Sequence, residues 1–235
     1  MRNGERLRLS SVMVLPLTLQ KWEKLTFIHW RYPAELLAAR LPRGLELDVC
    51  AGSGWVSMTP FLLSIRPPGL PGLSRVPETN LRTYVRGPGG SPGIWFFSLD
   101  IGNAAAALGA RLGYWLPYAW SEMRVREQGS AIRYASRRIV PPGAYTSVRV
   151  EVGRPLIAGE LEDFLSARFR LFTRVGPLLL KCEVRHPPWP LCEARLLELD
   201  ESLLQAAGLP QPAEEALVQF SPGVEVQAGP PTPVL

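Results

Sequence analysis

Residues 78–100 are the most informative part of the chain, and they read ETNLRTYVR, then GPGGSPG, then IWFFSLD. The first and last of these segments are typical of strands, and the middle segment consists of glycine, proline and serine. A phosphate-binding glycine loop passes from a strand into a helix, whereas this loop joins two strands. The stretch therefore predicts a β-hairpin, with strands over 78–86 and 94–100.

The first strand of this hairpin has two different faces, because side chains along a strand alternate with a period of two. One face carries Glu78, Asn80, Arg82 and Tyr84, and the other carries Thr79, Leu81, Thr83 and Val85. Without further information, the polar face is expected to be the solvated one.

The rest of the chain is divided into many short elements by 24 prolines and 21 glycines, as expected of a sheet-rich protein. Helices are predicted over residues 33–41, 104–114 (capped by Asn103), 159–167 and 199–207. Further strands are predicted over residues 45–50, 55–65, 122–126, 131–138, 145–152, 169–174, 178–186 and 192–199. Residues 66–75 are expected to form an irregular loop, and Asp100, before Gly102, is expected to shape a turn.

The length of 235 residues suits one domain over 1–235, with a basic leader at 1–15 and a loose proline-rich tail at 229–235. No apolar run approaches the roughly 20 residues of a membrane span. The three cysteines, Cys50, Cys182 and Cys192, form an odd set without C-x-x-C spacing. This set indicates neither a disulfide framework nor a zinc site, and it predicts a cytoplasmic protein.

The net charge is +5, and 23 of the 26 basic residues are arginines. Arginine stays protonated and cannot act as an amine nucleophile. A basic segment runs from Arg124 to Arg138, but Glu122 and Glu127 interrupt its charge and no recognition motif accompanies it. A solvated sheet face is the better interpretation, and no nucleic-acid partner is expected.

Several motifs, in order along the chain, resemble the YqjF-like family (domain of unknown function 2071) of the acetoacetate decarboxylase-like superfamily. They are Trp22, FIHW at 27–30, LPRGL at 41–45, NLRTYV at 80–85, GIWFFSLD at 93–100, LPY at 116–118, HPPWPL at 186–191 and AAGL at 206–209. The similarity runs from about Gln20 to about Val226. It implies an α+β fold: a cone-shaped, partly closed antiparallel β-barrel with a central cavity and flanking helices.

The resemblance also identifies a missing nucleophile. The decarboxylase forms a Schiff base through a lysine that directly follows a proline, six residues after an arginine. Arg111 and Pro117 match this frame, but Tyr118 occupies the position of the lysine and Ala119 follows it. A Schiff base requires a neutral amine, so the decarboxylase mechanism is not expected here.

The resemblance places Glu78 at the decarboxylase's pocket glutamate, which turns the polar face of 78–86 into the cone. Glu78 is then the expected general acid or base, and Arg82 the expected clamp on a carboxylate. Tyr118 is expected to donate a hydrogen bond to a developing oxyanion. The remaining expected substrate-binding residues are Tyr84, Trp95, Arg111 and His29. No metal and no cofactor is expected.

Two kinds of function follow from these expectations. One is an enzyme without a covalent lysine, a proton-transfer or lyase-type catalyst acting on a small organic acid or carbonyl compound. The alternative is a non-catalytic ligand-binding or assembly protein, with the cone filled by its own side chains. The sequence leaves a homo-oligomer open.

Overall fold

The hairpin predicted from residues 78–100 forms. Strand β4 (Leu73–Arg86) pairs antiparallel with β5 (Pro92–Ile101), and a short 3-10 turn, η1 (Pro88–Gly90), lies in the loop between them. The pairing shifts by one residue between Leu81 and Arg82. This bulge alters which side chains of β5 lie beside the polar residues of β4.

The computed structural model describes residues 18–69 and 71–234. The other strands in these residues are β1 (Thr18–Tyr32), β2 (Glu46–Leu47), β3 (Gly54–Arg66), β6 (Tyr118–Gln128), β7 (Ala131–Val140), β8 (Tyr145–Pro155), β9 (Arg170–Val175), β10 (Leu178–Arg185), β11 (Cys192–Glu201), β12 (Leu217–Ala228) and β13 (Thr232–Pro233). The helices are α1 (Ala34–Ala38), α2 (Ala104–Gly113), α3 (Glu160–Ser166) and α4 (Leu203–Ala206).

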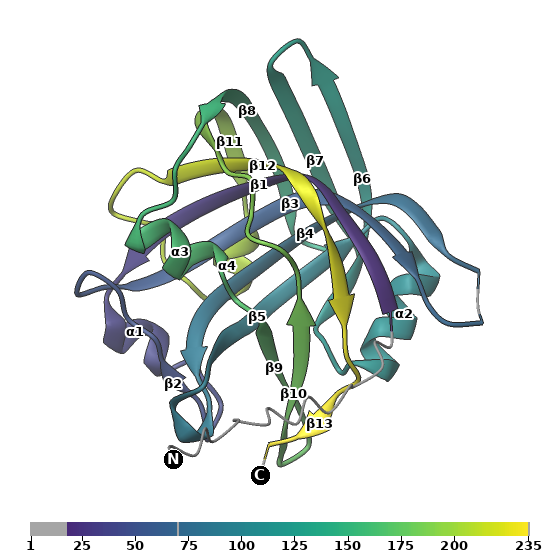
Figure 1. Cartoon of the computed structure of the whole chain (residues 1–235), viewed down its shortest axis with the longest axis vertical. Helices are drawn as coiled ribbons and strands as arrows, with labels where there is room; N and C mark the ends of the chain where they lie inside the picture. Colours follow the sequence, from purple (N-terminus) through teal and green to yellow (C-terminus); the bar gives the residue numbers. More distant parts are fainter. Residues whose placement is uncertain (1–17, 70, 235) are drawn as a thin grey trace, which may run out of the picture.

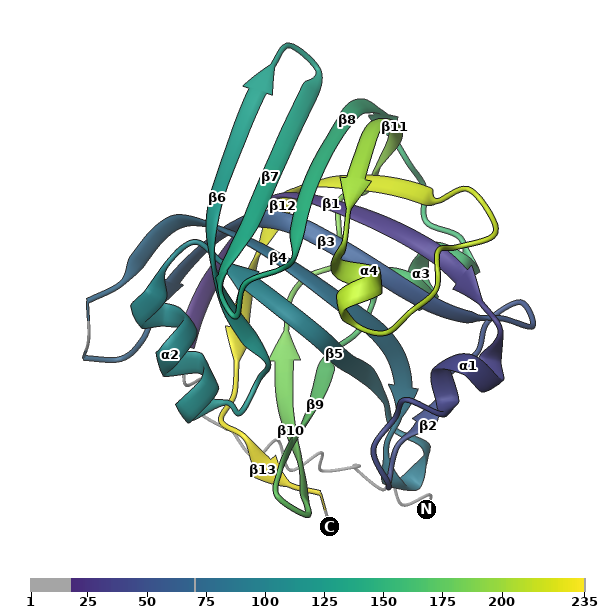
Figure 2. The same ribbon diagram turned by 180° about the vertical axis from the view of Figure 1, so that it is seen from behind.

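All of these strands belong to one sheet that curves into a partly closed barrel. Its order is β13-β10-β9-β5-β6-β7-β8-β11-β12-β1-β3-β4-β2, and the extra pairings of β4 with β5 and of β10 with β12 close it. Figures 1 and 2 show the curved sheet from its two sides, with the β6–β7 hairpin projecting beyond the rest. The barrel is therefore not evenly round.

The sheet is not wholly antiparallel, because β5 runs parallel to both β6 and β9. Parallel neighbours need a crossover connection, and α2 provides it between β5 and β6. This helix begins as predicted, since the Asn103 side chain accepts a hydrogen bond from the Ala106 amide. It lies outside the sheet in both views (Figures 1 and 2).

Strands β1, β3 and β4 are buried on both faces, as the continuous runs of buried residues at 25–30, 54–63 and 78–85 show. On one face, Ile28, Met58 and Leu81 pack in a large apolar cluster with residues of β7 and β8. The opposite, concave face carries the polar residues of β4. The expectation of a solvated polar face, drawn from the strand alone, is wrong because the barrel closes over it.

The C-terminal part of the chain differs most from the sequence prediction. The helix predicted over 199–207 begins only at Leu203, because residues 199–201 continue β11 against β8. Strand β12 was not predicted. The proline-rich tail is not loose in its described part, since Thr232 and Pro233 pair with β10. The predicted leader at 1–15 lies outside the described residues, and the assignment of one domain stays a prediction.

Asp100 does not shape a turn, and this prediction is wrong. The residue is fully buried in β5, and its Oδ1 atom accepts a hydrogen bond from Arg138 Nε at 2.7 Å. This ion pair connects β5 to β7. The rest of the basic hairpin behaves as predicted, because Arg124 and Arg137 are largely exposed and pair with the exposed Glu122.

The three cysteines are free, with Cys182 buried and the other two partly buried. Among the helices of residues 18–69 and 71–234, none is both long and apolar enough to cross a membrane.

Candidate functional site

Four polar side chains from three strands meet on the concave face of the sheet. Pairing sets His29 of β1 beside Ser57 of β3, and Ser57 beside Arg82 of β4. Glu78 lies on the same face of β4, two alternations before Arg82. All four side chains are buried, with exposed fractions of 5% or less. A buried polar row on central strands is costly unless it is paired or used.

Glu78 forms a hydrogen-bonded pair with Tyr118 of β6. The Tyr118 hydroxyl donates to Glu78 Oε2 at 3.2 Å. The pKa of Glu78 is raised to about 8, mainly by burial; the hydrogen bond from Tyr118 opposes this rise, and the charge of Asp100 adds to it. Burial also raises the pKa of Tyr118 well above its usual value. At neutral pH the pair is a carboxylic acid beside a phenol.

Arg82 is a buried guanidinium with two nitrogen atoms that lack a hydrogen-bond partner, while Tyr84 lies within hydrogen-bonding reach of the group. Within the described part of the chain, its Nε and Nη2 atoms have none, and the group lies over the ring of Phe27 at 5.6 Å. It does not pair with Glu78, since four residues along an extended strand separate the two Cα atoms by about 13 Å. Burial is the main reason that the pKa of Arg82 is lowered.

His29 begins a chain of hydrogen bonds that ends at helix α3. Its Nδ1 atom lies 2.5 Å from Ser57 Oγ, and Ser57 Oγ lies 2.6 Å from the Tyr84 hydroxyl. Tyr84 in turn donates to the Leu165 carbonyl at 2.8 Å. Burial lowers the pKa of His29 to about 3, and the charge of Arg82 contributes. The imidazole is therefore neutral.

Helix α3 is held against the concave face by an ion pair just after its last residue. Arg168 Nη1 lies 2.7 Å from Asp48 Oδ2, and both side chains are buried. The Arg168 guanidinium also lies over the rings of Phe164 and Tyr84, at 4.2 and 5.1 Å. These contacts fix the Leu165 carbonyl that accepts the hydrogen bond from Tyr84.

Two predicted site residues lie elsewhere, and the sequence prediction is corrected for them. Trp95 pairs with Thr83, and the bulge in the hairpin places Phe96 beside Arg82 instead. Trp95 therefore packs on the opposite face, with Leu45, Val85 and Phe172. Arg111 is exposed on α2, outside the sheet.

Sequence reasoning missed Ser57 and Gln219. The alternation of β3 could have identified Ser57 as a neighbour of His29 once the pairing of β1 with β3 was known. Gln219 could not be found, because its strand was not predicted. It pairs with Phe27, is 2% exposed, and its side chain lies within hydrogen-bonding reach of His29.

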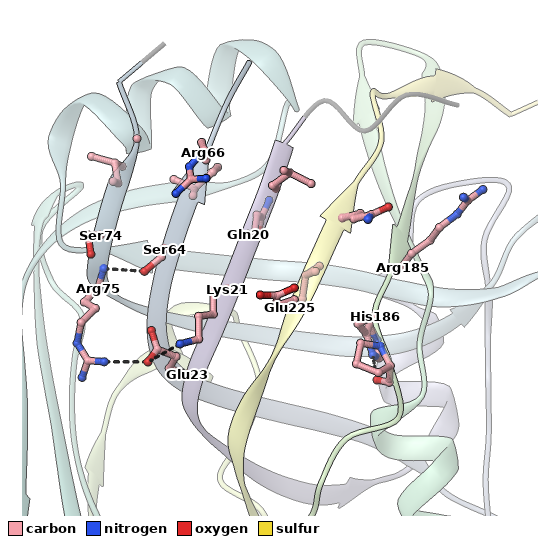
Figure 3. A pocket seen from close by; sticks show the side chains of 17 residues that line it. Gln20, Lys21, Glu23, Ser64, Arg66, Ser74, Arg75, Arg185, His186 and Glu225 are labelled. Carbon is pink, nitrogen blue, oxygen red and sulfur yellow. Dashed lines mark hydrogen bonds and ion pairs between the residues drawn. The ribbon is translucent and has the colours of Figure 1, made fainter. Parts of the chain in front are cut away.

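A separate groove of about 1230 Å³ lies outside this polar row, across β4, β3, β1, β12 and the end of β10. Figure 3 shows its charged side chains, in which Glu23 pairs with Lys21 at 3.4 Å and with Arg75 at 2.9 Å. Ion pairs at such exposed positions contribute little. Neither Glu78 nor Arg82 lines this groove, so its size does not make it the candidate site.

Comparison with known proteins identifies the family. The family described as "Uncharacterized conserved protein", domain of unknown function 2071, matches residues 19–225. The uncharacterized protein YqjF of Bacillus subtilis (strain 168) is 35% identical over 209 residues, which are 86% of either chain. The chain belongs to this family.

Solved structures show the same fold as this YqjF-like chain. Acetoacetate decarboxylase from Legionella pneumophila is 16% identical, with a TM-score of 0.64 over 94% of this chain and 87% of that one. The enduracididine biosynthesis enzyme MppR, complexed with pyruvate, is 14% identical, with a TM-score of 0.64 over 98% of this chain and 97% of that one. At these identities the likeness establishes the acetoacetate decarboxylase-like fold, as the sequence predicted, and nothing more.

No group of three or more His, Cys, Asp or Glu side chains is placed to hold a metal ion in the part of the chain that the structure describes.

Proposed function

We propose that this protein binds a small organic acid on the concave face of the barrel and transfers a proton to or from it. Arg82 holds the carboxylate of the ligand, and Glu78 is the proton donor and acceptor. The observation that carries this proposal is the buried guanidinium of Arg82, whose Nε and Nη2 atoms find no partner among the described residues. A carboxylate would accept both N–H bonds in a bidentate geometry.

The pair of Glu78 and Tyr118 supports a role in proton transfer. An acid–base catalyst works best when its pKa lies near the operating pH, and burial raises the pKa of Glu78 to about 8. The Tyr118 hydroxyl orients the carboxyl group at 3.2 Å. Near neutral pH, Glu78 can donate a proton and, once ionised, take one back from a carbon beside a carbonyl group.

A second candidate is a non-catalytic binding or assembly protein, and the aromatic packing inside the barrel favours it. Trp22 packs against Phe61 and Trp189, with ring centres 5.5 and 6.0 Å apart, and Phe27 meets Trp189 edge to face at 5.4 Å. These four aromatic rings fill part of the barrel interior in which a ligand would have to bind.

Hydrogen–deuterium exchange tests the proposal without knowledge of the natural substrate. The protein is incubated in D₂O with a panel of keto, enol and hydroxy acids, and loss of the C–H signal beside the carbonyl is followed by proton NMR. The wild type is expected to exchange this hydrogen faster than buffer alone does. Glu78→Gln should still bind the acid but should exchange the hydrogen no faster than buffer alone. Binding without exchange supports the second candidate, and absence of binding contradicts the proposal.

Borohydride is expected not to trap an imine with acetoacetate or related keto acids. Tyr118 cannot form an imine, and Lys21 and Lys24 lie beside Glu23 and Glu127 at the surface. The third lysine, Lys181, is in β10 between β9 and β13. Intact-mass measurement after reduction should show unmodified protein, and a reduced adduct on any lysine would contradict this expectation.

A further inference from the structure

Strands β11 and β12 separate soon after they meet. In the described residues, β11 pairs with β12 only through Cys192 and Glu193. The same register would next set Ala194 opposite Val218, but from this point β11 stays beside β8 and β12 stays beside β1 (Figure 2). The edge of β11 that faces away from β8 is therefore open over residues 194–201.

The hydrogen bonds to β8 show which peptide groups of β11 point to this open edge. The Ser202 amide donates to the Tyr145 carbonyl at 3.0 Å. Alternation along an antiparallel ladder then turns the backbone groups of Glu201 and Leu199 away from β8. Among the described residues, neither Leu199 nor Glu201 has a backbone hydrogen bond on that side.

The same holds nearer the start of the strand. The Val152 amide donates to the Ser130 carbonyl, on the β7 side, at 2.9 Å. Ala194 is opposite Val152, so its backbone groups also point away from β8. Leu196 follows two residues later and has the same orientation. Four peptide groups spaced along β11 thus face the open edge.

A groove of about 560 Å³ runs along this edge. All four of these residues line it, together with residues of β12 and of the segment between α4 and β12. Its interior is apolar, because it includes Trp30 and Leu204, which are 3% and 1% exposed. Leu199 lies 37% exposed beside it. An unpaired strand edge next to apolar pockets is the geometry that accepts an added strand.

The rim of the groove carries negative charge. Glu214 and Glu215 are exposed there, and the nearest guanidinium to Glu214, that of Arg31, is 3.9 Å away. The arginine that lines the groove, Arg195, is held by Glu151 at 2.7 Å and does not offset these two carboxylates. The rim therefore favours a cation on whatever occupies the groove.

We propose that this groove binds an extended segment of a partner protein, which adds to the open edge of β11 as a strand and carries lysine or arginine between apolar residues. Main-chain hydrogen bonds to β11 hold the segment. Its alternate side chains turn inward to Trp30 and Leu204, and outward to Glu214 and Glu215. This surface is distinct from the proposed carboxylate site, since neither Glu78 nor Arg82 lines it.

Three synthetic peptides test the proposal: a capped hexapeptide of alternating valine and lysine, the same peptide with glutamate in place of lysine, and the lysine peptide with every amide N-methylated. Fluorescence anisotropy of the labelled peptides measures their affinity. The lysine peptide should bind at least about tenfold more tightly than either of the others. Absence of binding, equal affinity of the lysine and glutamate peptides, or full affinity after N-methylation overturns the proposal.

Backbone amide exchange, followed by NMR, locates the bound peptide. Saturation with the lysine peptide should slow exchange at least about tenfold at the four amides that face the open edge. The amide of Ser202, which already bonds to Tyr145, should not change. Protection at another sheet edge overturns the proposal. So does protection of the same four amides that increases with protein concentration without peptide, because a second copy of the chain would then be the occupant.

Leu199→Pro tests the role of the strand edge. Proline removes the N–H that faces the groove but none that bonds to β8. The variant should bind the lysine peptide at least about tenfold more weakly, and Leu199→Ala, which keeps the N–H, should lose about threefold or less. A folded Leu199→Pro protein with wild-type affinity overturns the proposal. If this variant does not fold, the N-methylated peptide gives the same test on the wild type.

Glu215→Lys tests the charge of the rim. It should weaken binding of the lysine peptide about fivefold at low salt, and less at high salt. Glu46→Lys makes the same change at an exposed position of β2 and should bind as the wild type does. An equal effect of the two substitutions would mean that net charge alone attracts the peptide, and it overturns the proposal.

Discussion

Arg82→Leu is expected to weaken the binding of small carboxylates by at least about a hundredfold. Hydrogen bonds to charged groups contribute roughly 1.5–3 kcal/mol each, and two of them are lost. The free energy of unfolding should change by less than about 1 kcal/mol or should increase, because an apolar side chain replaces a buried charge that lacks a carboxylate partner. Calorimetry with lactate and pyruvate, and urea unfolding, measure the two quantities.

Arg111→Leu is the matched control, since it makes the same chemical change on the exposed face of α2. It should leave both measurements unchanged. If Arg82→Leu unfolds the protein, or lowers its stability as much as it lowers affinity, then Arg82 is a structural residue and the assignment of the carboxylate site is wrong.

Glu78→Gln is expected to change how stability depends on pH. Burial raises the pKa of Glu78 from 4.5 to about 8 in the folded chain, so the folded state holds a proton that the unfolded state releases. The free energy of unfolding should then fall between about pH 4.5 and 8, by about 1.4 kcal/mol for each pH unit from this group alone. The contribution is fully present below pH 4.5 and lost above 8.

Urea unfolding of the wild type and Glu78→Gln at several pH values measures this difference. The free energy of unfolding of the variant should not show this decrease with pH. The slopes of the two stability curves should therefore differ most between pH 5 and 8. Glu215→Gln, at an exposed position, should follow the wild type. Parallel curves for the wild type and Glu78→Gln would mean that Glu78 is ionised in the folded protein and is not poised to donate a proton.

The sequence predicted most of the strands, though not β12, and it predicted the family; with the family it predicted which face of β4 turns inward. Period-two alternation places Glu78 and Arg82 on the same side whatever surrounds them. The burial of that side could not be deduced from β4 itself, because it depends on closure by strands and a helix more than 70 residues away in sequence, such as α3 and β12.

Other parts of the site were beyond the sequence for identifiable reasons. The bulge between Leu81 and Arg82 turns Phe96, instead of Trp95, to the face that carries Arg82. A shift of one residue in strand pairing cannot be recognised from amino-acid composition. Arg111 was chosen because its distance in sequence from Pro117 matches the decarboxylase motif. That distance does not determine whether the Arg111 side chain faces the sheet or solvent. The contacts of His29 depend on Ser57, Tyr84 and α3, which meet only after three separate segments have packed.

The anchoring of α3 by Asp48 and Arg168 has a consequence for His29. The hydroxyl of Tyr84 points outward only while the Leu165 carbonyl is there to receive it. Without that carbonyl, Tyr84 can turn its proton back to Ser57, and Ser57 can then donate to Nδ1 of His29. No net charge moves in this reversal. The position of one short helix thus sets the direction in which the protons point along this buried row of side chains.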